Sequence, residues 1–270
     1  MRSLLRHTLS RFPTAKAGLK RLRDALFPSA AVSSHYVELN DTETDTEAAR
    51  LRSAWQTEAL PRRQRELVDR QLAAYRRGTP LDVFDVMVRA LRKLCPAAGR
   101  LSVLEVGCSS GFYAEVIGMA GLPIDYAGCD YSAAFVALAR ASYPGLSFDV
   151  EDATALRYRD AAFDVVISGC CLLHIPEYEQ AIAETARVAR HFAVFHRTPV
   201  VLGAATKYFR KQAYGIETVE IHFNEPQLLA LFQRHGLELI ETYTLNEERD
   251  RADPQRGNAN RSYVCRKGKP

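Results

Sequence analysis

The chain has 270 residues, of which 47% are hydrophobic and 25% charged, with a formal net charge of +4. These values are ordinary for a globular protein with a substantial core, and they argue against a nucleic-acid binder that relies on overall charge. None of the six cysteines stands in a CxxC pair or at zinc-ligand spacing, and no run of 18 apolar residues could span a membrane. We therefore expect no metal and a reducing, cytoplasmic setting, without a secretory signal.

Residues 1–27 have leucines at helical spacing among seven basic side chains, and Pro13 interrupts the pattern. Two short amphipathic helices fit better than one long helix. Three interpretations stay open. The helices pack on their own domain, they bind an anionic membrane surface at the inner face of the membrane, or they form a mitochondrial transit peptide.

The polar, acidic residues 40–47 indicate a linker or the start of a helix, and residues 47–77 have strongly helical composition. Gly78 and Pro80 end that pattern, and residues 81–94 form another expected helix. We therefore predict a helical N-terminal region over residues 1–95. Its helices could cap an active site or only pack against a sheet, and we expect Trp55 to be a core residue.

After Arg100 the pattern changes to alternating strands and helices, which predicts a mostly parallel sheet covered on both faces. The expected strands are 101–106, 124–129, 146–150, 163–168, 192–195, 237–243 and 262–266. The expected helices are 112–119, 132–141, 177–190 and 225–235. The last strand follows the sixth without a helix, which favours an antiparallel edge. The prediction is a doubly wound α/β domain with a seven-stranded sheet over residues 96–270.

The strand at residues 101–106 runs into a turn that contains Gly107, Ser109 and Gly111, and then into a helix. The two glycines can adopt dihedrals closed to other residues, and the helix turns free N–H groups toward a ligand. Ligands of open α/β sheets bind beyond the carboxyl ends of the strands. A dinucleotide fold would show GxGxxG here. The acid Glu105 before the turn suits a cationic amino-acid ligand better than a pyrophosphate.

This turn resembles motif I of the class I S-adenosylmethionine-dependent methyltransferases, E/D-x-G-x-G-x-G, with Ser109 in place of the middle glycine. The resemblance implies a Rossmann-like methyltransferase fold and S-adenosyl-L-methionine as cofactor. It further implies that the segment from Glu105 through Gly107, Ser109 and Gly111 to Tyr113 contacts that cofactor.

The next strand ends in Asp130, 19 residues after Gly111. An acid about 20 residues beyond such a turn can bind both hydroxyls of a ribose, and Tyr131 could lie against the adenine. The alternative is that Asp130 only caps the helix that follows Ser132.

Two further segments extend the resemblance, so that its four motifs cover about residues 101–175. In similar enzymes an acid followed by a small residue binds the adenine edge through its carboxylate and the next backbone N–H, which implies this role for Asp152 and Ala153. The strand that ends at Ser168 resembles motif IV, where the strand end faces the transferred methyl group.

Methyl transfer to a hydroxyl needs a base or a metal to remove a proton. The sequence beyond residue 168 lacks an acid cluster suited to a divalent ion, so we expect a metal-independent reaction. His174, His196 and His222 follow predicted strand ends or precede a helix on the expected ligand side, and each could act as the base at neutral pH. His196 is the first candidate, and a site without a histidine base also remains open.

The segment 206–223 contains aromatic and polar residues, among them Lys207, Tyr208, Arg210, Lys211, Tyr214 and Glu217. Such a loop suits a hydroxyl-rich acceptor. Its amino-acid sequence partly resembles that of methyltransferases found among bacterial surface-polysaccharide and natural-product genes. We expect O-methylation of a sugar, a glycan or another small molecule, without nucleic acid as a partner. The alternatives are an RNA or protein methyltransferase and a non-catalytic S-adenosylmethionine-binding module.

Overall fold

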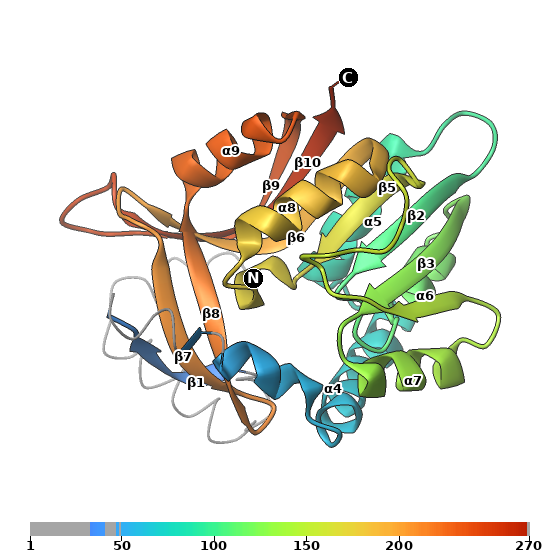
Figure 1. The fold of residues 1–270 in the computed structure, drawn as a ribbon, viewed down its shortest axis with the longest axis horizontal. Helices are drawn as coiled ribbons and strands as arrows, with labels where there is room; N and C mark the ends of the chain where they lie inside the picture. The colour runs from blue at the N-terminus through green and yellow to red at the C-terminus, as the bar shows by residue number, and fades with distance from the viewer. Residues whose placement is uncertain (1–32, 41–46, 49, 269–270) are drawn as a thin grey trace, which may run out of the picture.

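The computed structural model describes residues 33–40, 47–48 and 50–268 (Figure 1). Its strands are β1 (Ser33–Glu38), β2 (Leu101–Val106), β3 (Ile124–Asp130), β4 (Ser147–Val150), β5 (Phe163–Gly169), β6 (Ala189–Leu202), β7 (Lys207–Ala213), β8 (Ile216–Asn224), β9 (Leu237–Arg249) and β10 (Gly257–Lys267). Its helices are η2 (Ala54–Gln56), α4 (Leu60–Arg76), α5 (Asp82–Leu94), α6 (Tyr113–Met119), α7 (Ala133–Ser142), η3 (Leu172–His174), α8 (Tyr178–Val188) and α9 (Glu225–Arg234). The predicted amphipathic start, residues 1–27, lies outside the described residues.

The predicted doubly wound sheet is confirmed. Strands β4, β3, β2, β5 and β6 lie side by side and are all parallel. Strand β10 pairs antiparallel with β6 and with β9. The predicted antiparallel last strand is therefore confirmed, but it lies between β6 and β9, so that β9 forms the edge. In parallel sheets the carboxyl ends of the strands meet at one edge, which is where ligands bind.

The sheet is larger than the seven strands that the sequence predicts, because the described residues add β8, β7 and β1 beyond β6. The segment 206–223, predicted to be a loop, is mostly a hairpin of β7 and β8. Its turn is Tyr214-Gly215, with φ values of 50° and 81°, the backbone sign that two-residue hairpin turns require. The alternating buried residues Val219, Ile221 and Phe223 anchor β8 in the core.

The N-terminal region is only partly helical in the described residues. Strand β1, which the sequence analysis does not predict, pairs antiparallel with β7. The expected helix over residues 47–77 is interrupted after η2, and α4 starts with Pro61 at its N-terminus, where proline is favoured because its missing N–H has no partner there anyway. Figure 1 shows α4 between the β1–β7–β8 end of the molecule and α7. The described helices include none long and apolar enough to cross a membrane.

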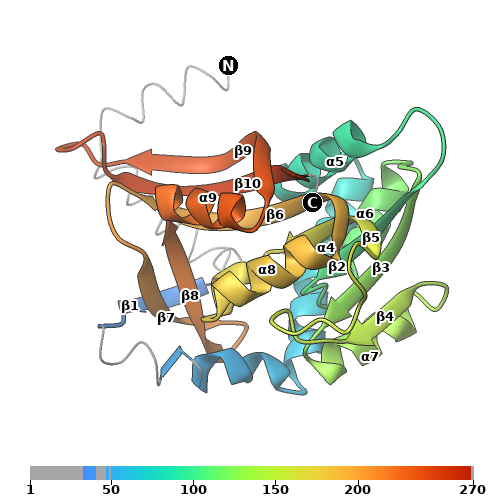
Figure 2. The same cartoon turned by 45° about the horizontal axis from the view of Figure 1, so that its top comes forward.

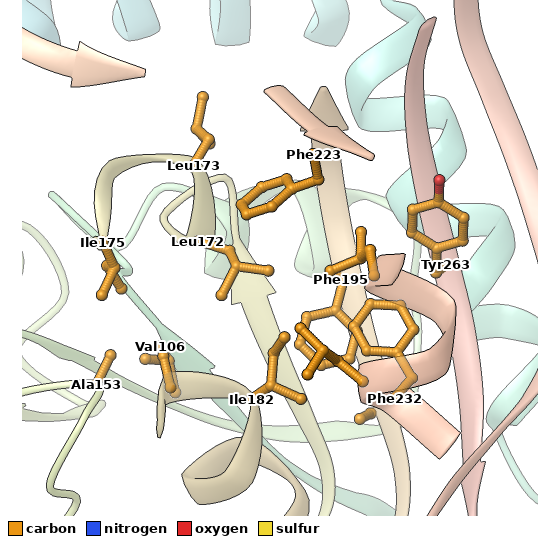
Figure 3. Close-up of a cluster of buried hydrophobic side chains, with 14 of the residues drawn as sticks. Val106, Ala153, Leu172, Leu173, Ile175, Ile182, Phe195, Phe223, Phe232 and Tyr263 are labelled. Carbon is orange, nitrogen blue, oxygen red and sulfur yellow. The ribbon is translucent and has the colours of Figure 1, made fainter. Parts of the chain in front are cut away.

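Two hydrophobic cores lie on the two faces of the sheet. One core packs α8 and α9 against the sheet, and the other packs α4, α5, α6 and α7 against it. Figure 2 shows α8 and α9 together on one face. In Figure 3 the rings of Phe195 and Phe232 lie face to face, with centroids 4.2 Å apart. Burying each such side chain stabilises the fold by about 1.5–3 kcal/mol, which holds α9 against β6 and fixes the strand ends that surround the site.

Candidate active site

A cavity of about 420 Å³ lies beyond the carboxyl ends of the parallel strands. Its walls come from the turn after β2, the end of β3, the segment after β5, the hairpin β7–β8 and helix α4. Of the residues predicted to bind a cofactor or to act as a base, those on its wall are Gly107, Ser109, Tyr113, Asp130, Tyr131, Ala153 and His174. The structure therefore brings together most of one predicted cofactor site and one of the three predicted histidines.

The turn after β2 has three residues in the left-handed region, Gly107, Ser109 and Gly111, with φ values of 72°, 52° and 73°. Ser109, which stands where the family pattern has a glycine, therefore adopts the glycine-like conformation itself. The N–H of Gly107 donates to the Cys129 carbonyl at 2.8 Å, which ties the turn to β3. A Cβ atom at Gly107 would overlap the side chain of Cys171. The turn is thus packed from below and open toward the cavity.

Replacing Gly107 with Ala should weaken binding of the predicted cofactor at least about tenfold, which corresponds to about 1.4 kcal/mol. The added methyl group meets Cys171 and an L side chain is strained at φ 72°. Gly121→Ala is the matched control, because Gly121 has φ 62° but nothing within 4 Å of the added Cβ. Calorimetric titration of both variants measures the effect. Equal affinity in the two variants would show that the turn tolerates a side chain.

Asp130 ends β3 on the cavity wall, and its carboxylate orients the turn. It accepts hydrogen bonds from the backbone N–H groups of Ser109 at 2.9 Å and Ser132 at 3.0 Å. Burial raises the pKa of Asp130 to about 6, although these two N–H groups oppose the shift. A carboxylate has about four acceptor sites, so Asp130 can accept further hydrogen bonds from a ligand. The Asp130 side chain therefore both accepts from the N–H of Ser132 in the following turn and lies on the cavity wall.

Asp152 does not face the cavity as predicted. Its carboxylate accepts hydrogen bonds from Arg52 at 2.6 and 2.8 Å and from the backbone N–H of Thr154 at 2.8 Å. These interactions lower the pKa of Asp152 although burial opposes them. Arg52 also lies over the ring of Tyr131, 5.5 Å from its centroid. Ala153, the neighbour of Asp152, remains on the cavity wall.

Glu105, Gly111 and Ser168 lie behind the cavity wall rather than on it. Burial raises the pKa of Glu105 to about 8, and its carboxyl accepts a hydrogen bond from the Tyr126 hydroxyl. Glu105 is therefore mostly neutral at pH 7. The Ser168 hydroxyl lies 3.2 Å from the Cys171 thiol. These residues support the turn from inside the protein instead of contacting a ligand in this conformation.

The three histidines occupy different environments, and the structure does not place the first candidate, His196, on the cavity wall. It is buried off the cavity wall, and both ring nitrogens are engaged, Nε2 with the Tyr113 hydroxyl at 3.0 Å and Nδ1 with the Ser262 hydroxyl at 2.8 Å. Burial and the neighbouring Arg197 charge lower its pKa to about 3. His222 also lies off the wall, with Nε2 2.8 Å from Glu220.

His174 is the histidine on the cavity wall. Its Nδ1 lies 2.6 Å from the Val219 carbonyl, and since a carbonyl only accepts, Nδ1 carries the proton. Burial first, and then the charge of Lys211, lower the pKa of His174 to about 3, so the ring is neutral and Nε2 carries a lone pair that no described residue uses. Trp55, expected in the core, lies on the wall beside it with ring centroids 4.6 Å apart.

Three charged wall residues are outside the predicted cofactor and catalytic sets, and the sequence analysis names one of them, Lys211, only in the segment expected to face the acceptor. Lys211 and Glu220 of the hairpin form a buried ion pair, and Arg197 lines the cavity from β6. Burial favours a higher pKa for Glu220, but the hydrogen bond with His222 and the charge of Lys211 outweigh it and lower the pKa of Glu220 to about 2. All three residues lie inside strands, Arg197 in β6, Lys211 in β7 and Glu220 in β8, so no strand end marks them in the sequence.

The comparisons with known proteins agree with this geometry. The family model described as "Methyltransferase domain" matches residues 104–195. The chain is 35% identical over 111 residues to a "Probable S-adenosylmethionine-dependent methyltransferase" of Mycolicibacterium smegmatis, which covers 41% of each chain. It is 34% identical over 94 residues to the phthiotriol/phenolphthiotriol dimycocerosates methyltransferase of Mycobacterium tuberculosis, 34% of this chain and 35% of that protein. The chain thus spans about two fifths or less of the length of these relatives.

Two solved structures share the fold at low sequence identity. The 1,6-didemethyltoxoflavin-N1-methyltransferase of Burkholderia thailandensis, solved with 1,6-didemethyltoxoflavin and S-adenosylhomocysteine, is 17% identical with a TM-score of 0.51, over 75% of this chain and 88% of that chain. Magnesium protoporphyrin IX methyltransferase from Synechocystis PCC 6803, with bound SAH, is 16% identical with a TM-score of 0.50, over 68% of this chain and 82% of that chain.

Proposed function

Because the chain belongs to the class I S-adenosylmethionine-dependent methyltransferases, we propose that it transfers a methyl group from S-adenosyl-L-methionine to a hydroxyl of a small molecule. The observation that carries the proposal is one cavity that joins the turn at Gly107 and the acid Asp130 to His174, whose Nε2 makes no hydrogen bond with the described residues. The relatives that act on small molecules, such as the toxoflavin methyltransferase, support this class of acceptor.

The residues on the wall fit the cofactor. Gly107 and Ser109 offer a turn whose backbone can approach a ligand closely. Asp130 has acceptor capacity left for ribose hydroxyls, and Tyr131 and Ala153 stand beside it for the adenine. Asp152 is paired with Arg52, so we assign it the indirect role of fixing the N-terminal region over this end of the cavity.

When bound, S-adenosylmethionine supplies a methyl group on a positively charged sulfur. The protein's part is to hold the acceptor oxygen in line with that carbon and sulfur at near-attack distance. His174 would accept the proton that the hydroxyl loses as it takes the methyl group, because Nε2 carries no proton in the tautomer fixed by Val219. The hydrogen bond from Nδ1 to Val219 holds the ring in the tautomer that this transfer needs.

The other interpretations fit the cavity less well. A non-catalytic binding module would not need a base beside the cofactor half of the cavity. An RNA or protein acceptor would have to insert a single nucleotide or side chain into the cavity between α4 and the hairpin, whereas a small molecule can enter it whole. A sugar or glycan acceptor and contact of residues 1–27 with a membrane remain proposals, the second outside the described residues.

We predict that methyl transfer needs no metal ion. Among the described residues, no group of three or more His, Cys, Asp or Glu side chains is placed to hold one, and His174 can accept the proton instead. A screen with radiolabelled S-adenosylmethionine over sugars, phenols, hydroxy acids and RNA, with and without chelator, tests both statements. Transfer to RNA alone would contradict the small-molecule proposal. Activity lost on chelation and restored by magnesium would contradict metal independence.

A further inference from the structure

Arg197 reaches the cavity because of a β-bulge. In the pairing of β10 with β6, His196 and Arg197 stand opposite the single residue Ser262. A bulge re-aims side chains next to active sites, and here it directs His196 into the core and Arg197 onto the cavity wall. Arg197 has φ 58°, which is unfavourable for an L side chain. The Ser262 hydroxyl contacts both residues. It lies 2.8 Å from Nδ1 of His196 and accepts a hydrogen bond from the backbone N–H of Arg197 at 3.3 Å.

The charge of Arg197 is not balanced within the described part of the chain. Three cationic side chains line the cavity there, Arg52, Lys211 and Arg197. Arg52 is paired with Asp152 and Glu177, and Lys211 with Glu220. The Arg197 guanidinium makes neither an ion pair nor a hydrogen bond with the described residues. Among the described residues on the hairpin side of the wall, Arg197 and Lys211 therefore stand against one acid, Glu220, which leaves one positive charge in excess.

The surroundings of Arg197 are those of a binding site for an anion. Electrostatic interaction with Cys170 first, and then with Tyr113, Tyr214 and the Glu220 carboxylate, raises the pKa of the guanidinium although burial opposes the shift, so the group stays charged. A charge withdrawn from water is costly unless it is paired. The rings of Trp55 and Tyr214, whose centroids are 6.3 Å apart, add flat apolar surface to the same cavity wall.

We propose that the methyl acceptor is an organic acid, whose carboxylate or phosphate oxygens bind the Arg197 guanidinium. The planar fork of arginine donates two parallel hydrogen bonds to either group. This inference rests on the proposed function and names its substrate class. It also links the acceptor to the base, because the Arg197 charge helps to lower the pKa of His174. An anion on Arg197 offsets that charge and makes His174 a better base when the acceptor is bound.

The test compares acids with neutral molecules of the same shape on protein saturated with S-adenosylhomocysteine. Benzoate, benzamide, phenyl phosphate and phenol are titrated by NMR into the wild type, Arg197→Gln and Arg197→Lys. The matched control is Arg63→Gln, which removes a positive charge from outside the cavity, where Arg63 donates to the Tyr214 carbonyl. Thermal denaturation shows that each variant is folded.

We expect the wild type and Arg63→Gln to bind benzoate or phenyl phosphate at least about tenfold more tightly than the neutral partner. Arg197→Gln should lose that preference and Arg197→Lys should keep part of it. The better of the two acids distinguishes a carboxylate from a phosphate acceptor. A wild type without preference for acids, or a preference that survives in Arg197→Gln, overturns the proposal.

The cofactor also carries a carboxylate, which could bind Arg197 in place of the acceptor. The same variants distinguish these two ligands of Arg197. Arg197→Gln should bind S-adenosylmethionine as tightly as the wild type does. An equal loss of cofactor affinity would assign Arg197 to the methionine carboxylate and would overturn the organic-acid proposal while the methyltransferase proposal stands. A wild type that binds neither S-adenosylmethionine nor S-adenosylhomocysteine would instead overturn the proposed function itself.

Discussion

His174→Asn should lower the turnover number of methyl transfer by about 10²- to 10⁴-fold, the usual contribution of a general base. The asparagine amide can still donate to the Val219 carbonyl, as Nδ1 does at 2.6 Å, so the local structure is retained. The variant has no group that accepts the proton in place of Nε2. Single-turnover kinetics with the acceptor found in the screen measure the effect, and cofactor affinity should not change.

His222→Asn is the control for this prediction. His222 lies off the cavity wall with its Nε2 against Glu220, so its loss should change turnover far less than the loss of His174. Unchanged turnover in His174→Asn would remove it from the mechanism. Parallel losses of turnover and of cofactor affinity would show a structural role only.

Asp130→Ala should weaken S-adenosylmethionine binding by about 1.5–3 kcal/mol, the range for a hydrogen bond to a charged group. The wild-type carboxylate lies on the cavity wall with acceptor capacity to spare, whereas alanine offers none. Asp125→Ala is the matched control on the same strand, because the exposed Asp125 side chain pairs only with Arg100 at the surface. Calorimetry of both variants should separate them by at least tenfold in affinity.

The same carboxylate predicts how binding depends on pH. Burial raises the pKa of Asp130 to about 6, so the group is ionised above that pH and protonated below it. Affinity should therefore fall as the pH is lowered through about 6, and the wild type should approach Asp130→Ala in acid. Since an ordinary aspartate titrates near pH 3.9, an affinity that stays constant down to pH 4 would separate Asp130 from ligand binding.

The parts of the site that the structure places on the cavity wall as the sequence predicts are local. Gly107 and Asp130 each lie where a predicted strand ends, and the periodicity of apolar residues is sufficient to locate strand ends. The hairpin could also have been predicted, because Val219, Ile221 and Phe223 alternate with polar residues after Tyr214-Gly215. The segment 206–223 was predicted to be a loop because it is rich in polar residues, although the alternation of apolar and polar residues indicates a strand.

The predicted residues that the structure leaves off the cavity wall depend on contacts between distant segments. The Asp152 carboxylate is occupied by Arg52, 100 residues earlier, which itself lines the cavity. His196 is buried and Arg197 exposed to the cavity because of a register shift between β6 and β10. A shift of one residue exchanges the two faces of a strand. Neither the pairing nor the shift has a local signal in the sequence.

The central claim is that the cavity beyond the carboxyl ends of β2, β3 and β5 binds S-adenosylmethionine. Isothermal titration calorimetry of the wild-type chain with S-adenosylmethionine at pH 7.5 tests it most directly, with Asp130→Ala titrated alongside. We expect saturable binding to one site per chain, competed by S-adenosylhomocysteine and at least tenfold weaker in the variant. A folded wild-type chain that shows no saturable binding, or binds with an affinity that Asp130→Ala leaves unchanged, would contradict it.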